Sequence, residues 1–130
     1  MKFVAPLAVR HYECDSYGHV NHAVFVNYLE HARMQFLQAA GYDYAGLVAA
    51  GFFTVIAHLD IAYRAPAFAG DSLEIDTESV ATRRASGTFR QTIRRGDTVI
   101  AAAEVHWCVV DRTGRPARPP AQFDLRRLVS

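Results

Sequence analysis

The sequence predicts an α+β domain in which an antiparallel sheet of about five strands wraps around one long central helix. Only one stretch, residues 23–40, repeats its apolar side chains every three to four positions, which is the period of an amphipathic helix. Several other stretches alternate apolar and polar residues, which is the period of a strand. The length of 130 residues, with 51% hydrophobic and 21% charged residues, fits a single globular domain spanning residues 1–130.

Composition also argues against some partners and indicates a location for the protein. The 14 Lys and Arg residues against 13 Asp and Glu residues leave a net charge of +1, which argues against nucleic acid as a partner. No apolar run approaches the roughly 20 residues of a membrane span. Residues 1–9 are apolar but contain Pro6 and lack a small-residue cleavage site, so we interpret them as mature protein. Cys14 and Cys108 form no CxxC pair, and reduced thiols predict a cytoplasmic protein.

The first half of the chain supplies one strand and the helix. Residues 3–14 alternate as an extended segment, and turn formers follow at 15–22. The helix predicted over Ala23–Ala40 has Asn21 as a plausible N-cap and Gly41 as the residue just after its end.

The second half supplies four strands. In the first, the side chains of alternate residues from Phe53 to Tyr63 are predicted to share one face. Further strands are predicted around 73–78, 88–95 and 99–110, with turns at 85–87 and 96–97 between them. A helix with one apolar stripe must pack against this sheet. The free sheet edges, and apolar residues expected on the other sheet face, predict a homo-oligomer.

The segment from Tyr12 to His22 carries the chemistry, because it ends where the helix begins. A helix N-terminus offers unpaired N–H groups and a partial positive charge, which suit an oxygen that becomes negative during reaction. Gly18 permits a tight turn, and Asp15 places a carboxylate just before those donors. Together these features form half of an acyl-transfer site.

The pattern Asp15-x-x-Gly18-His19-Val20-Asn21-His22, followed by Tyr28-Leu29-Glu30-x-Ala32-Arg33, resembles the hot-dog-fold acyl-CoA thioesterases. The most similar branch is the 4-hydroxybenzoyl-CoA thioesterase-like group. The strand, helix and four-strand order is similar over nearly the whole chain. The resemblance implies one hot-dog domain with active sites at a dimer interface, and dimers that commonly pair into tetramers. It implies no cofactor and no metal.

The resemblance also implies roles for individual residues. Asp15 matches the aspartate that acts as nucleophile or as base toward water, and the backbone N–H at His22 matches the group that polarises the thioester carbonyl. Gly18 and Asn21 complete the catalytic candidates. The candidates for substrate binding are Tyr17 and His19 in the same segment and Arg83, Arg84 and Ser86, which are expected to meet the phosphates of coenzyme A.

Other interpretations of these residues stay open. Asp15 is also a common turn residue, and the ring of His22 is either a hydrogen-bond donor or solvated. Asn21 either caps the helix or binds the attacking water. Glu30 either pairs with Arg33 or matches the catalytic glutamate that other relatives carry within the helix. The spacing of Asp15, His19 and His22 does not favour a metal site.

Departures from the family pattern leave the mechanism open. Many relatives carry Asp-x-Asp where this chain has Glu13-Cys14-Asp15, and some have a tyrosine at the position of His11. The hypothesis is therefore hydrolysis of an acyl-CoA, through a covalent anhydride or through activated water. The alternatives are hydrolysis of an acyl carrier protein thioester, a hot-dog protein that binds acyl-CoA without cleaving it, and, last, a hot-dog hydratase.

Overall fold

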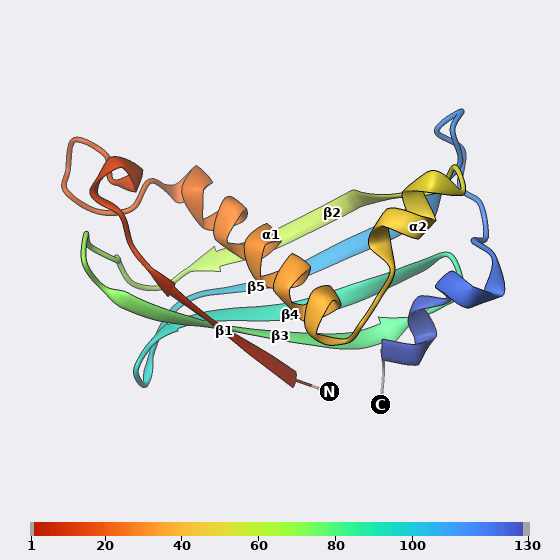
Figure 1. The fold of residues 1–130 in the computed structure, drawn as a ribbon. Helices are drawn as coiled ribbons and strands as arrows, with labels where there is room; N and C mark the ends of the chain where they lie inside the picture. Colours follow the sequence, from red (N-terminus) through yellow and green to blue (C-terminus); the bar gives the residue numbers. More distant parts are fainter. Residues whose placement is uncertain (1, 129–130) are drawn as a thin grey trace.

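The computed structural model describes residues 2–128, which form one curled sheet and a long helix lying across its concave side (Figure 1). The main elements are β1 (Lys2–Ala8), α1 (His22–Ala39), α2 (Tyr44–Ala49), β2 (Phe53–Tyr63), β3 (Ser72–Thr82), β4 (Ser86–Arg95) and β5 (Thr98–Val110). Short 3-10 turns lie at His11–Glu13, Ala121–Phe123 and Leu125–Leu128.

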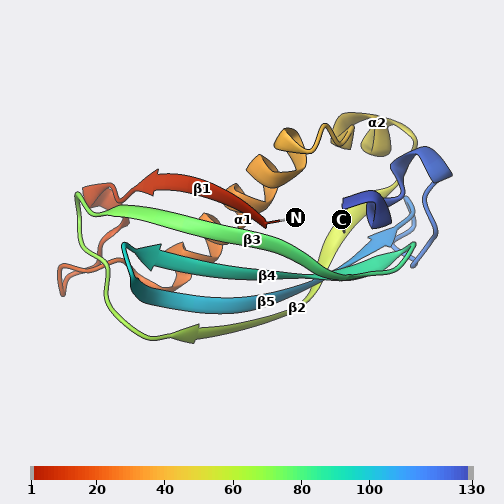
Figure 2. The ribbon, with the colours of Figure 1, turned by 90° about the horizontal axis from the view of Figure 1, so that it is seen from below.

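The five strands are ordered β1-β3-β4-β5-β2, and every neighbouring pair is antiparallel. Figure 2 shows this order, in which β1 and β2 are the two edge strands. The predicted fold is therefore confirmed: an α+β domain with five strands curled around one helix. The two edges differ, because β1 is short and carries Pro6, whereas β2 is long and lacks proline.

Helix α1 packs on the sheet through the apolar stripe that its period predicts. The buried members of that stripe are Phe25, Tyr28, Leu29, Ala32, Phe36 and Leu37. They meet buried sheet residues such as Ile75, Ile93 and Val105. Burying one such large apolar side chain contributes about 1.5–3 kcal/mol.

Both predicted helix-end signals are confirmed. The side-chain oxygen of Asn21 accepts a hydrogen bond from the N–H of Ala23 at 2.9 Å. At the other end Gly41 has a φ of +72°, a conformation that glycine adopts without strain. Hydrogen bonds from Gly41 N to Gln38 O and from Tyr42 N to Leu37 O then satisfy the last carbonyl groups of the helix.

The face predicted for β2 is wrong in its first half, because the strand contains a β-bulge. The register with β5 shifts between Ile56 and His58, which leaves Ala57 as an extra residue. A bulge of one residue reverses the alternation. Ile56 therefore pairs with buried Trp107 on the inner face, and Val55 pairs with Cys108 on the outer face.

Two further differences concern short elements. The predicted N-terminal strand ends at Ala8 rather than continuing to residue 14, because a 3-10 turn follows at His11–Glu13. The segment 42–50, for which no element was predicted, contains α2, whose Leu47 is fully buried.

The outer sheet face is mainly polar, which differs from the apolar residues expected there. The prediction of a homo-oligomer therefore rests on the open edge strand β2 rather than on an apolar sheet face.

Within residues 2–128, no helix is long and apolar enough to cross a membrane. Cys14 and Cys108 are both free thiols. The cytoplasmic location stays a prediction.

Candidate active site

Asp15 lies in a tight hairpin turn that leads into α1. Its backbone N–H bonds to His19 O, and the N–H of Gly18 bonds back to Asp15 O at 3.0 Å. Gly18 has a φ of +89°, so the turn requires a residue without a Cβ. The turn is anchored on the sheet side, because Val20 N donates to Ala67 O at 2.8 Å.

The two carboxylate oxygens of Asp15 have different neighbours. Oδ1 accepts a hydrogen bond from the N–H of Tyr17 at 2.9 Å, which is the geometry of a turn residue. Oδ2 lies 3.9 Å from Nδ1 of His19, and a quarter of the Asp15 side chain is exposed. The turn interpretation therefore accounts for Oδ1, whereas Oδ2 accepts no hydrogen bond within the described residues.

The first turn of α1 keeps one backbone donor free. The two N–H groups after His22 are both bonded to Asn21: Ala23 N–H donates to its side-chain oxygen, and Val24 N–H donates to its backbone carbonyl. The N–H of His22 makes no hydrogen bond within the described residues. It lies at the positive end of an 18-residue helix, where a negative oxygen is stabilised.

These groups share an open groove of about 360 Å³, which we call the Asp15 groove. Its lining residues are Asp15, His19, Val20, His22, Phe25, Tyr63, Arg64, Ala65 and Pro66. A carboxylate, two imidazoles and a free helix N-terminus therefore border one space. This set can activate a nucleophile and stabilise an oxyanion.

Comparison with known proteins identifies the family. A family model described as the thioesterase-like superfamily matches residues 9–126. The chain belongs to the thioesterase-like superfamily. It is a hot-dog protein and a thioester hydrolase.

Two curated relatives and one solved structure illustrate the similarity. The acyl-CoA thioester hydrolase YbgC of Escherichia coli is 34% identical over 107 residues, covering 82% of this chain and 80% of that protein. A chloroplastic acyl-acyl carrier protein thioesterase of Arabidopsis thaliana, ATL3, is 35% identical over 119 residues, covering 90% of this chain and 63% of that protein. A hypothetical protein from Thermus thermophilus, TT1821, has a TM-score of 0.91 and 31% identity, with 100% and 99% coverage.

In this thioester hydrolase the predicted site residues fall into two groups. Asp15, His19 and His22 line the Asp15 groove, with Gly18 and Asn21 shaping its backbone. Tyr17 stacks on His19 with ring centroids 6.2 Å apart, is largely exposed, and lies outside the groove lining.

The predicted phosphate-binding residues lie at the other end of the molecule. Arg83 and Ser86 flank the β3–β4 turn, where Arg83 N donates to Ser86 O at 2.7 Å, and both line a separate hollow. Nε of Arg84 is buried and has no hydrogen-bond partner within the described residues. The Asp15 turn lies beside the opposite end of β3, and an 11-residue strand is about 33 Å long. One chain therefore does not bring the two groups together (Figure 1).

Sequence reasoning missed two polar residues of the groove, Tyr63 and Arg64. Both lie at the end of β2, about 40 positions after the Asp15 turn, and the strand pattern alone treats Tyr63 as ordinary core. Their proximity depends on how the sheet curls around α1. The run Tyr63-Arg64-Ala65-Pro66, which ends a strand with a proline, was the only local signal.

A polar network under the turn ties it to α1. Glu13 accepts hydrogen bonds from the backbone N–H of Arg10, the guanidinium of Arg10 and the hydroxyl of Tyr28, at 2.8, 2.7 and 2.8 Å. Burial acts to raise the pKa of Glu13, but these hydrogen bonds outweigh it, so the pKa is lowered. The carbonyl of Glu13 also accepts from Asn21 N. Glu13 thus links both ends of the turn to the helix.

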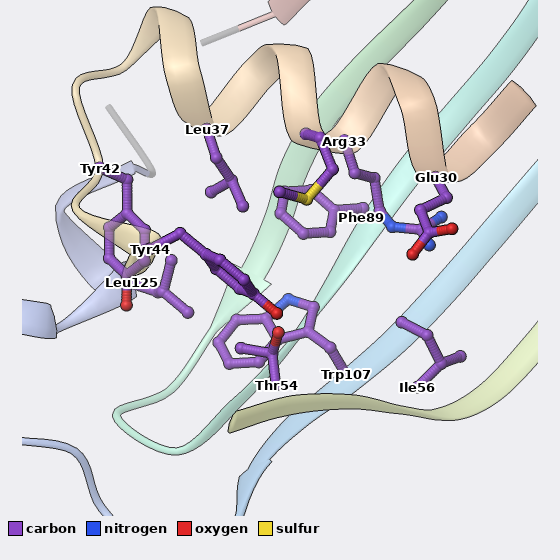
Figure 3. Close-up of a pocket in the computed structure, with 11 residues that line it drawn as sticks. Glu30, Arg33, Leu37, Tyr42, Tyr44, Thr54, Ile56, Phe89, Trp107 and Leu125 are labelled. Atoms are coloured by element: carbon purple, nitrogen blue, oxygen red, sulfur yellow. The ribbon is translucent and has the colours of Figure 1, made fainter. Parts of the chain in front are cut away.

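A second cavity, of about 100 Å³, lies along the later part of α1 and shares no lining residue with the Asp15 groove (Figure 3). Glu30 and Arg33 point toward one another at its edge. Burial lowers the pKa of Arg33, although Glu30 opposes that effect, and Arg33 also donates to Gln91 at 3.1 Å. Glu30 is therefore outside the Asp15 groove of its own chain.

Within residues 2–128, no group of three or more His, Cys, Asp or Glu side chains is arranged to hold a metal ion. Asp15, His19 and His22 share the groove but do not form such a group.

Proposed function

We propose that the protein hydrolyses the thioester of an acyl-CoA to a free carboxylic acid and coenzyme A. The proposal rests on one observation: Asp15 and His22, whose N–H is free, line the same groove. The carboxylate supplies the nucleophile or base, and the helix N-terminus supplies the oxyanion hole. The relative that is named an acyl-CoA thioester hydrolase, at 34% identity, supports coenzyme A as the carrier.

Two reaction routes use these groups. In the covalent route, an Asp15 oxygen attacks the carbonyl carbon, the C–S bond breaks, coenzyme A leaves as a thiolate, and water hydrolyses the resulting anhydride. In the general-base route, Asp15 takes a proton from water as the water oxygen attacks the same carbon; the C–S bond then breaks, and the departing thiolate of coenzyme A takes up the proton from Asp15. In both, the carbonyl oxygen becomes negative beside His22 N–H. A thiolate leaves without a strong acid, which explains why few side chains are needed.

The working unit in this proposal is a dimer formed through β2. This edge strand exposes Val55, Ile56 and Tyr63, and it has a partner strand on one side only. Antiparallel pairing with a second copy sets the Phe53 end of one β2 beside the Tyr63 end of the other. That arrangement brings the Asp15 groove of one protomer toward Arg83 and Ser86 of the second copy. The arginine then contacts a substrate phosphate.

The acyl carrier protein alternative has one specific support. The plant relative that is 35% identical is named an acyl-acyl carrier protein thioesterase. Both carriers present a thioester on a phosphopantetheine arm, so the Asp15 chemistry is the same for each.

The test is thiol release from a panel of short, medium, long, branched and aromatic acyl-CoAs, with the same acyl groups presented on acyl carrier protein. We expect turnover of CoA esters with a preference for one acyl class. Turnover of the carrier-protein thioesters alone would contradict coenzyme A as carrier. Measurable binding of CoA esters with no hydrolysis of any substrate would contradict the enzymatic proposal and support the non-catalytic binder.

A further inference from the structure

Tyr63 connects the open edge of the sheet to the start of α1. It is the last residue of β2, and its register with buried Ala101 directs its side chain to the inner face. Its hydroxyl donates a hydrogen bond to the carbonyl oxygen of His22 at 2.9 Å. These two residues are 41 positions apart in the chain.

The ring of Tyr63 also holds the side chains around it. It meets the His22 ring edge-on, with centroids 6.3 Å apart and an interplanar angle of 86°, and it lies 5.8 Å from the ring of Phe25. Tyr63 is 46% exposed and its hydrogen bond to His22 is open to solvent, so the hydroxyl contributes little to the stability of the fold. Its placement beside Asp15 in the groove therefore needs another reason.

The geometry points to that reason. Asn21 fixes the chain before His22 by capping Ala23 and Val24, and Tyr63 fixes the carbonyl of His22 itself. The residue is thus held on both sides of its own free N–H. We propose that Tyr63 is a positioning residue that aims the His22 N–H at the thioester oxygen, an inference that rests on the proposed function.

Through this role of Tyr63, formation of a dimer would affect the position of the oxyanion donor. Tyr63 ends the strand whose outer edge has no partner, so pairing of that edge with a second copy restrains the residue that holds the oxyanion donor. An alignment error of a fraction of an ångström in such a donor is costly, because preorganisation is the source of its effect.

The direct test is Tyr63→Phe, which keeps the ring and removes the hydroxyl. We expect kcat to fall about tenfold with KM changed less than about twofold, because the lost interaction acts in the transition state. The matched control is Tyr42→Phe, which removes a tyrosine hydroxyl that donates to a backbone carbonyl, Phe123 O, at 2.8 Å away from the groove. This control should lower the melting temperature at least as much and leave kcat unchanged.

A double-mutant cycle with His22→Pro separates positioning from general loosening. Proline removes the N–H of His22, so Tyr63→Phe should have no further effect on kcat in that background. An equal loss in both backgrounds, an effect confined to KM, or an equal kcat loss in Tyr42→Phe would overturn the role of Tyr63. A wild-type chain that cleaves no thioester refutes the proposed function, and this role with it. Wild-type turnover with unchanged kcat in Tyr63→Phe refutes Tyr63 alone.

Discussion

His22 contributes two separable groups to the Asp15 groove, its imidazole ring and its backbone N–H. His22→Ala removes the ring and keeps the N–H. His22→Pro removes both, and proline is well tolerated at the first position of a helix. The extended conformation of Asn21, with φ −62° and ψ 139°, also suits a residue before proline.

We therefore predict that His22→Pro lowers kcat by about 10²–10³-fold, which is the usual effect of removing one oxyanion donor. His22→Ala should lower it by less than about tenfold. Steady-state thiol release with melting temperatures for both variants checks this. Equal losses in the two variants would show that the ring, rather than the N–H, carries the effect.

Asp76 offers a test of the charge pairs that hold β3 to β4. Arg94 donates to both of its carboxylate oxygens, at 2.7 and 2.8 Å, and Lys2 lies 3.5 Å away. The hydrogen bonds from Arg94 lower the pKa of Asp76, against the opposing effect of burial. A lowered pKa stabilises the fold above the unfolded pKa of about 3.9, and that stabilisation is lost as the pH falls through the folded value.

Asp76→Asn should accordingly lower the free energy of unfolding by about 1–3 kcal/mol at pH 7. The difference from wild type should shrink as the pH falls below about 4, because the unfolded chain then binds a proton at Asp76 before the folded chain does. Urea unfolding at pH 7 and pH 3 measures both. Glu74→Gln is the control, since the half-exposed Glu74 lies 3.6 Å from the same arginine and should change stability by less than about 1 kcal/mol. A difference that is the same at both pH values would contradict the role of charge.

Among the helices and strands, the sequence predicts best those features that are determined by neighbouring residues, such as the two ends of α1. The apolar period, Asn21 and Gly41 located α1 to within a residue at each end, because caps act over one helical turn. The bulge at Ala57 was missed, since a strand pattern assumes an unbroken alternation. Helix α2 has six residues, too few to show a period.

The candidate site divides in the same way. Asp15, Gly18, Asn21 and His22 lie in one segment of eight residues, 15–22, so one motif predicts them together. Tyr63 joins them only because the end of β2 curls toward the start of α1, and that proximity depends on sheet order and curvature. No spacing of residues in the sequence predicts that Tyr63 lies close to this segment.

For the whole molecule, the proposed dimer through β2 makes a matched pair of substitutions possible. Val55 on β2 and Val4 on β1 are both 41% exposed, and each lies on an edge strand. Val55→Lys places like charges on the paired edges of two copies, whereas Val4→Lys adds a lysine opposite Asp76 on the other edge.

We predict that Val55→Lys yields a monomer with greatly reduced kcat and a free energy of unfolding at low concentration within about 0.5 kcal/mol of wild type. Val4→Lys should remain a fully active dimer. Analytical ultracentrifugation and thiol release measure the two properties on the same samples. A Val55→Lys monomer with full activity would contradict an active site shared between copies.

In the proposed mechanism the carboxylate of Asp15 performs the chemistry, a claim that Asp15→Asn tests. Asparagine can still accept the hydrogen bond from Tyr17 N–H, so the turn should persist. Asp43→Asn is the matched control, because Asp43 likewise accepts a backbone N–H, from Gly46 at 2.9 Å, away from the groove. We predict that kcat for acyl-CoA hydrolysis falls about 10²–10⁴-fold in folded Asp15→Asn and is unchanged in Asp43→Asn. Wild-type kcat in folded Asp15→Asn would contradict the claim.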